Sequence, residues 1–444
     1  MRARPLGVAW ALALAVAGCA QPSRDRAWVA DAIEARTGHR IASAGGETPG
    51  RALPDDVSLE DGVDEDEAVA IALHASPAFL ADMARLTSAT ADFEEAARID
   101  NPRLGAQGPI GVIAAATSLL APIMSLFQLP QRTEAAGRAL ESVAESLVQS
   151  GLDLARDARL AHIDQVLAEE RLRILEALQE NAEGLSAIAA ARADAGDSSP
   201  AEALAVRADA FVAADAVAVA TRDRVTAAAR LAVLLGREAS DPLEVVARRS
   251  LPGAAPPVAD LLRVARDGRP DVRAAALELE AAGARAGWER SRIVSLSIQA
   301  DAQWTSTAGG VRLGGTIDLP IFNQNQGGVG RAEAAIERAR HRLDAVRQQV
   351  TLEVVSARAR LEQSLVSRAR YADDVLPPLE GALVAATERF ELGDDSYLVV
   401  LDASARVGAA RLRLAELDAE VRRAHAELER AVGARLSIRT EVEP

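Results

Sequence analysis

The feature that most constrains the fold is an internal duplication of most of the chain. Ala68–Pro77 resembles Leu261–Pro270 at an offset of 193 residues, and Gly137–Ala139 matches Gly330–Ala332 at the same offset. Further matches, at an offset of 197, are Gly196–Ser199 with Gly393–Ser396 and Gly236 with Gly433. Constant offsets at glycine and proline are not expected from chance similarity between alanine-rich helices, so two halves follow one plan. The second half gains four residues between its paired glycines, about one helical turn.

Each half is predicted to contain long helices around a non-helical stretch. A helix follows the shared proline, over 79–98 and 271–290, and a much longer one runs from about Gln131 to Asp194. Its apolar residues recur three, four or seven positions apart, as in a packed helical seam. About sixty residues make a rod on the order of 90–100 Å long. Gly196 and Gly393 then break the helical pairs. Such extended hairpins are predicted to pack laterally against copies of themselves.

Composition and motifs exclude several functions. Hydrophobic residues make up 49% of the chain but aromatic residues only 3%, which is typical of long helices and coiled coils. The formal net charge of −15 argues against a nucleic-acid partner. No histidine pair has metal-ligand spacing, and there is no nucleophile elbow, phosphate loop or metalloprotease motif. The sequence therefore predicts no enzyme, no cofactor and no metal site. The histidines are His39, His74, His162, His341 and His425.

The non-helical stretch of the second half has the pattern of a β-hairpin. Ile293–Trp304 alternates apolar and polar residues, and Val311–Leu319 alternates less cleanly after a turn at 306–310. Strands of about ten residues with one apolar and one polar face fit a transmembrane barrel. A hairpin lying on a helix in a soluble domain explains the pattern equally well.

The equivalent stretch of the first half is less regular. Gly105–Gln131 contains no charged residue, and Ile110–Leu129 is almost continuously apolar, so taken alone it is a candidate transmembrane helix. Its prolines and glycines, and its match to the second hairpin, oppose that interpretation. We predict two strands, Arg103–Ile113 and Pro122–Pro130, joined by an alanine-rich loop, and keep the helix as the alternative.

The N-terminus has the pattern of a secretory signal over residues 1–18. Arg2 and Arg4 precede the apolar run Leu6–Ala17, and small residues lead to Cys19. This resembles a bacterial lipobox, which predicts lipidation of Cys19; a plain signal peptide with an incidental cysteine is the alternative. Cys19 is the single cysteine, so disulfides are excluded. The predicted organisation continues with a tether (19–64), a first repeat (65–236), a linker (237–260), a second repeat (261–436) and a tail (437–444).

One segment resembles a known family. Leu319–Gly327, with the sequence Leu-Pro-Ile-Phe-Asn-Gln-Asn-Gln-Gly, resembles the strand-to-helix junction of TolC-type outer-membrane efflux proteins, in particular the metal and small-molecule efflux branch. Pro320 ends a strand ladder where a missing amide is tolerated, and Asn323 can cap the next helix. The predicted junction residues are Pro130, Pro320, Phe322, Asn323, Asn325 and Gly327. The resemblance covers roughly residues 60–436, although the first-half junction at Pro130 lacks the asparagine-rich segment.

The resemblance implies a mainly α-helical, duplicated TolC-like fold in a homotrimer. Four strands per chain would contribute to a β-barrel in the outer membrane of a Gram-negative bacterium, and the helices to a periplasmic α-barrel. Its tip would dock a membrane-fusion adaptor and, through it, an inner-membrane efflux pump. Asp402 falls at a family position of an acidic entrance ring, which would favour cations; Val399 replaces the ring's other acid. The predicted docking residues are Gly196, Ser199, Gly393, Asp394 and Ser396.

The predicted function is a passive exit duct for metal ions or small toxic molecules, driven by the pump. The alternative is a lipid-anchored periplasmic coiled-coil scaffold or adaptor without a barrel. The low aromatic content favours that alternative, because barrels usually carry interfacial aromatic belts. Only Phe127, Trp304 and Phe322 stand where such a belt could lie.

Overall fold

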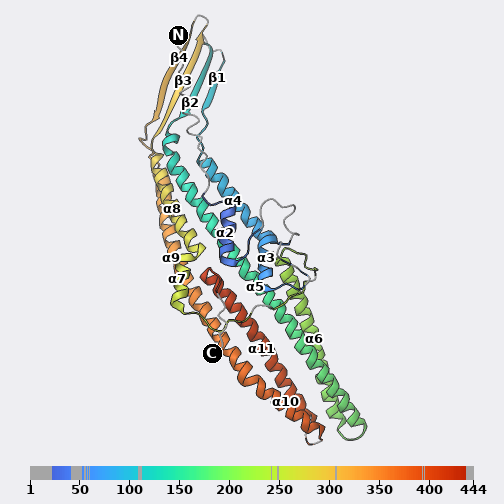
Figure 1. The fold of residues 1–444 in the computed structure, drawn as a ribbon. Helices are drawn as coiled ribbons and strands as arrows, with labels where there is room; N and C mark the ends of the chain where they lie inside the picture. Colours follow the sequence, from blue (N-terminus) through green and yellow to red (C-terminus); the bar gives the residue numbers. More distant parts are fainter. Residues whose placement is uncertain are drawn as a thin grey trace. The chain divides into compact units, whose positions relative to one another are not determined.

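The computed structural model contains long helices and one four-stranded sheet (Figure 1). It describes residues 23–41, 53–54, 57, 59, 61–108, 113–241, 243–247, 250–305, 308–392, 394 and 396–436. The predicted signal segment, Cys19 and Gly393 therefore lie outside the described residues. The chain divides into two compact units. We call them the sheet unit (1–29, 82–147 and 270–347) and the helical unit (30–81, 148–269 and 348–444).

The sheet unit is built from two copies of a helix–hairpin–helix arrangement. All neighbouring strands pair antiparallel, in the order β1-β2-β3-β4. The first copy comprises α4 (Pro77–Ala96), β1 (Arg103–Gln107), β2 (Ile113–Pro122) and the start of α5 (Met124–Asp194). The second comprises α8 (Pro270–Ser291), β3 (Ser295–Thr305), β4 (Gly309–Asp318) and the start of α9 (Gln326–Ala369).

The second hairpin confirms its prediction, whereas the first corrects it. β2 occupies the segment predicted as an alanine-rich loop. The predicted strand Pro122–Pro130 was wrong, because α5 begins at Met124 and contains Pro130. Pro130 therefore does not mark the junction. The apolar run is not one transmembrane helix either, since β2 and the start of α5 divide it.

No single helix within the described ranges is long and apolar enough to cross a membrane. α3 (Glu65–Ala75) and α4 pass that test only as a pair, bent by 49°.

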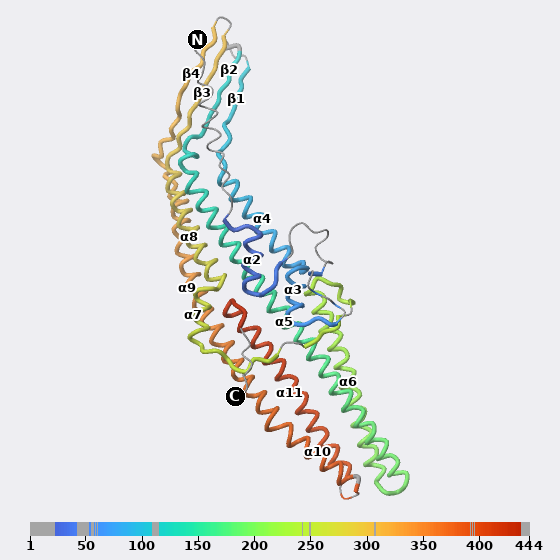
Figure 2. Tube along the Cα trace, in the orientation of Figure 1, coloured from blue at the N-terminus to red at the C-terminus, as the bar shows by residue number. Residues whose placement is uncertain are grey.

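The helical unit contains the remaining helices, whose colours in Figure 2 run from blue for α2 to red for α11. They include most of α2 (Arg26–Thr37), α3, the end of α5, α6 (Pro200–Leu234), α7 (Val258–Gly268), the end of α9, the π-helical turn η1 (Arg370–Val375), α10 (Leu376–Glu391) and α11 (Tyr397–Val432). Gly236 and Gly433 follow α6 and α11 with φ of +73° and +76°. Both helices therefore end where the sequence predicted, on left-handed glycines.

The N-terminal segment predicted as a tether is partly ordered. It contains α2, in which Val29 and Ile33 are fully buried. Gly151 makes room for Ile33, because a Cβ there would lie 2.6 Å from the Ile33 Cδ1 atom. Asp25 accepts the Trp28 amide at 2.9 Å at the start of α2. Residues 26–37 are thus a packed helix and not a free linker.

Buried ion pairs connect the helices of the helical unit. Arg159 of α5 donates to Glu429 of α11 at 2.6 Å, and both side chains are at most 6% exposed. Arg269, which follows α7, donates to Glu353 of α9 at 2.6 Å and to the Ala431 carbonyl at 3.0 Å. Removing one partner of such a buried pair leaves an uncompensated charge, so these contacts fix which helices adjoin.

Candidate functional site

The sheet has two chemically different faces. Strand register places small and large apolar side chains on one face, with Thr117 as the polar exception. Its exposed large members are Leu104, Leu119, Ile298, Trp304, Val311, Leu313 and Ile317. The opposite face is mainly polar, with Ala116, Leu120 and Pro122 as its apolar exceptions; its polar residues include Arg103, Gln107, Ser118, Ser297, Gln299, Asp301, Gln303, Arg312, Thr316 and Asp318. Alternation along β3 and β4 thus separates an apolar from a mainly polar surface.

Among the residues that the structure describes, none covers the apolar face. Leu313 is 81% exposed and Leu104 is 75% exposed. Every residue of β4 is exposed, so no helix within the described ranges packs on either side of that strand. This arrangement excludes a hairpin lying on a helix, which was the soluble alternative. β1 and β4 are the edge strands of the sheet.

At each of the two junctions between sheet and helices, an equivalent side chain donates a hydrogen bond to the end of the preceding helix. Arg132 Nε donates to the Ala96 carbonyl at 2.8 Å, at the end of α4. Asn325 Nδ2 donates to the Glu289 carbonyl at 2.8 Å, near the end of α8. Both the donors and the acceptors are 193 residues apart, the offset of the repeat. Each half therefore satisfies a carbonyl in the last turn of one helix from the start of the next.

The predicted junction residues have different roles. Pro320 follows the end of β4, as predicted, and Phe322 is 92% exposed. Asn323 does not cap α9; its Oδ1 accepts the Asn325 amide at 3.0 Å. Asn325 directly precedes α9 and takes a φ of +58°, which asparagine tolerates better than most residues. Gly327 lies in the first turn of α9.

The two helical breaks in the helical unit share one geometry. Gly196 has a φ of +83°, and the Asp197 amide donates back to the Arg192 carbonyl at 2.9 Å. In the second half, the Asp394 amide donates to the Arg389 carbonyl at 2.9 Å. These contacts tighten the helix ends. Ser199 and Ser396 then cap the returning helices by accepting the amides of Ala201 and Leu398.

An apolar cluster brings the two breaks together. Tyr397, at the first position of α11, is 4% exposed and packs with Ala189 of α5 and Val206 of α6. Burial raises the pKa of the Tyr397 hydroxyl, and the nearby carboxylate of Glu202 adds to this. Figure 1 shows the breaks at the same end of the helical unit. Sequence reasoning missed Tyr397, although an aromatic residue directly after a capping serine was a usable signal. Partly buried neighbours are Leu185, Ala203 and Phe390.

Asp402, the acid predicted to lie at the entrance, forms an ion pair with Arg406. Its carboxylate lies 2.9 Å from the Arg406 guanidinium one turn later, and both side chains are more than half exposed. Val399 is 45% exposed on the same helix. An exposed pair of this kind contributes little stability, so Asp402 is free of a structural role within the chain.

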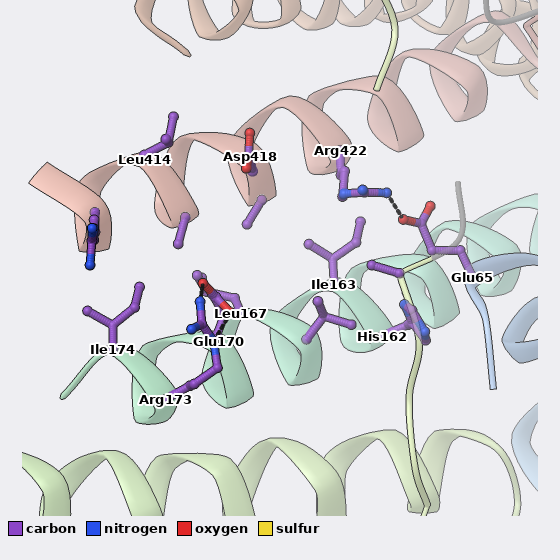
Figure 3. Close-up of a pocket in the computed structure, with 15 residues that line it drawn as sticks. Glu65, His162, Ile163, Leu167, Glu170, Arg173, Ile174, Leu414, Asp418 and Arg422 are labelled. Atoms are coloured by element: carbon purple, nitrogen blue, oxygen red, sulfur yellow. Dashed lines mark hydrogen bonds and ion pairs between the residues drawn. The ribbon is translucent and has the colours of Figure 1, made fainter. Parts of the chain in front are cut away.

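A cavity of about 330 Å³ lies between α5 and α11 (Figure 3). Apolar residues such as Ile163 and Leu414 line it. Its charges are matched: Arg422 pairs with Glu65 at 2.8 Å, and Arg173 with Glu170 at 2.9 Å. Sequence reasoning did not predict this cavity.

At one end of the cavity, the fully buried His162 Nε2 lies 2.8 Å from the Val63 carbonyl. Burial lowers the pKa of His162, so its neutral form, donating from Nε2, is favoured.

Residues 261–434 match the model of the outer membrane efflux protein family. The chain is also 29% identical over 313 residues to the cobalt-zinc-cadmium resistance protein CzcC of Cupriavidus metallidurans, covering 68% of this chain and 73% of the relative. The second half of the chain therefore matches the outer membrane efflux protein family, and the chain as a whole is similar to a metal-resistance relative. The resemblance seen in the junction segment is therefore confirmed.

Solved membrane channel and outer membrane proteins share the fold. The channel protein CusC has a TM-score of 0.71 at 20% identity, covering 88% of this chain and 96% of CusC. The outer membrane protein VceC of Vibrio cholerae has a TM-score of 0.71 at 18% identity, covering 83% and 96%. The predicted fold class and the function as an outer-membrane efflux channel are confirmed. The outer membrane efflux proteins are transport channels and not an enzyme family.

Proposed function

We propose that three copies of the chain form the outer-membrane exit channel of a tripartite system that expels metal ions. The observation that carries this proposal is the uncovered sheet with one apolar and one polar face. An apolar surface of this extent is unfavourable in water but matches lipid, while the opposite face suits a water-filled conduit. The edge strands β1 and β4 would pair with neighbouring copies, because open edges do not persist in lipid.

The partners are a periplasmic adaptor and an inner-membrane pump, which outer membrane efflux proteins serve in general. We assign adaptor docking to the two helical breaks. Their shared geometry and the Tyr397 cluster support this, because they present two equivalent turns side by side. The docking residues would be Gly196, Ser199, Gly393, Asp394 and Ser396.

The cargo and the anchor follow from different observations. Similarity to a cobalt-zinc-cadmium resistance protein supports divalent metal ions as cargo. The exposed Asp402 carboxylates of three copies would narrow the entrance and attract cations.

Cys19 would carry a lipid that anchors the chain in the outer membrane, as its lipobox-like context suggests.

Imaging of the full-length protein, extracted from outer membranes in detergent, tests the channel. We expect three-fold tubes more than about 100 Å long, the length that the helices require. Compact or rod-like monomers would contradict the barrel and favour a coiled-coil scaffold.

Metal-resistance assays test the docking assignment. Gly196→Pro should abolish resistance while leaving trimers intact, because it distorts the break where the adaptor docks. Gly283→Ala, in α8 where a Cβ meets nothing within 4 Å, is the control. Full resistance in Gly196→Pro would show that the adaptor docks elsewhere.

A further inference from the structure

The polar face of the sheet carries two opposite charges side by side, near the middle of its strands. Asp301 of β3 is the register partner of Arg312 of β4. A glutamine orients each of them: Gln299 Nε2 donates to the Asp301 carboxylate at 2.8 Å, and Arg312 donates to Gln303 Oε1 at 3.2 Å. Because these residues lie on strands and not on loops, their level along the sheet is fixed.

The surroundings of Arg312 leave its side chain open to the polar surface. Its neighbours on the same face of β4 are Gly310 and Gly314. A Cβ at either glycine would meet nothing within 4 Å. On β4 itself the guanidinium therefore has no flanking side chain, and beside its contact with Gln303 of β3 it acts on a passing ion through water.

We propose that Asp301 and Arg312 together set the charge selectivity of the exit channel. This rests on the proposed function, because the polar faces of three sheets must line one pore. The pore then carries three carboxylates and three guanidinium groups at one level. Rings of a single charge select ions of the opposite sign. A mixed ring discriminates weakly, so hydrated metal cations and anionic metal complexes both pass.

The expected size of the effect follows from Coulomb's law. A unit charge about 10 Å from a monovalent ion in water changes the local ion population roughly twofold. Removing three equivalent charges should therefore change the cation population roughly eightfold and the anion population roughly eightfold in the opposite sense, so the cation-to-anion permeability ratio changes by up to roughly sixtyfold at low salt, and by less as salt screens the pore.

Reversal potentials in planar bilayers under a potassium chloride gradient test the proposal. The proposed Asp402 entrance contributes the same cation preference to the wild type and to every variant, so each variant is compared with the wild type. Arg312→Gln should shift the selectivity toward cations and Asp301→Asn toward anions, because each change removes one charge per copy. The double variant should return toward the wild type. Arg312→Lys keeps the charge and Val311→Leu alters the apolar face, so both should match the wild type.

The outcomes separate the two proposals. If wild-type protein forms no channels, the proposed function and this inference both fail. If channels form but neither single variant shifts the reversal potential, the channel stands and the charge pair does not set its selectivity. Trimer formation is checked for each variant first. Should Arg312→Gln not assemble, Asp301→Asn alone decides, because an unshifted potential there overturns the inference.

Discussion

Gly196 and Gly236 take the same left-handed conformation after a helix, but their surroundings differ. Their φ values are +83° and +73°. A Cβ on Gly196 would meet nothing within 4 Å, whereas a Cβ on Gly236 would lie 2.3 Å from the Ala75 carbonyl oxygen. Backbone oxygen does not move aside as a flexible side chain does. The first glycine is therefore required for its backbone angle alone, and the second also for the close approach of α3.

This difference predicts that a glycine-to-alanine substitution lowers the stability of the protein by different amounts at the two positions. Gly196→Ala should destabilise the protein by about 1–2 kcal/mol, the cost of a left-handed non-glycine residue. Gly236→Ala should cost about 1–3 kcal/mol more, because overpacking adds to the strain. Denaturant unfolding of the detergent-solubilised protein measures both. Equal losses would show that α3 yields to the added methyl group.

His162 predicts a pH dependence of stability. Burial lowers its pKa below the ordinary value of 6.5, against the opposing effects of Glu65 and Asp64. Between the lowered pKa and 6.5, the unfolded chain binds a proton that the folded chain excludes. The contribution of His162 is thus fully present above pH 6.5 and is lost as the pH falls toward the folded pKa, by at most about 1.4 kcal/mol per pH unit.

Melting midpoints between pH 7.5 and about 5, a range that spans the titration of an ordinary histidine, check this dependence. The wild type should lose stability on acidification more steeply than His162→Gln. His341→Gln, at an exposed position on α9, is the matched control and should follow the wild type. Parallel curves for all three proteins would remove His162 as the cause.

At the scale of elements, the duplication predicts that equivalent residues at the two junctions stabilise the helix ends in the same way. Arg132 and Asn325 satisfy equivalent carbonyls, so Arg132→Ala and Asn325→Ala should both destabilise the sheet unit. We expect about 1.5–3 kcal/mol for the charged donor and about 0.5–1.5 kcal/mol for the amide. Gln324→Ala, one residue away and exposed, is the control. Hydrogen exchange at the ends of α4 and α8 reports the loss locally, and unchanged protection there would contradict the capping role.

The two hairpins show where sequence reasoning succeeds and where it fails. The second hairpin was predicted because large apolar and polar residues alternate in β3. β2 was missed because its alanine, serine and threonine side chains are too alike in polarity to show a period of two. Pro130 misled the prediction because proline usually ends a helix. It lies seventh in α5, where Gln128 anchors the helix start to the Ser291 carbonyl at 3.1 Å.

The four extra residues of the second half are accompanied by a π-helical turn, which their number alone did not predict. Between Gly330 and Gly393 the helix contains the π-helical turn η1, whose end is marked by the Leu376 amide donating to the Tyr371 carbonyl. Pro377 and Pro378 follow directly and supply no amide donors. Four added residues exceed one turn of 3.6, so a wider turn here takes up part of the mismatch.

At the scale of the whole molecule, the function depends on surfaces that a single chain leaves uncovered. Alternation in the strands predicted which residues share a face of the sheet, but not that both faces stay free of helices. That required the structure, since a soluble hairpin on a helix has the same sequence pattern. The tip cluster around Tyr397 was hidden for a related reason: its members come from four helices distant in sequence.

Adjacent residues of β4 allow the lipid-facing assignment to be tested at constant depth. Leu313 lies on the apolar face and Gly314 on the polar face. Leu313→Arg should prevent assembly in the outer membrane, because an arginine facing lipid near the bilayer centre costs about 2–4 kcal/mol in each of three copies. Gly314→Arg should assemble normally, since Arg312 already shows that this face accepts a guanidinium. Heat-modifiable trimers in outer-membrane fractions are the measurement. Assembly of both variants would mean that the apolar face does not meet lipid, and loss of both would mean that the two faces are not distinguished by the membrane.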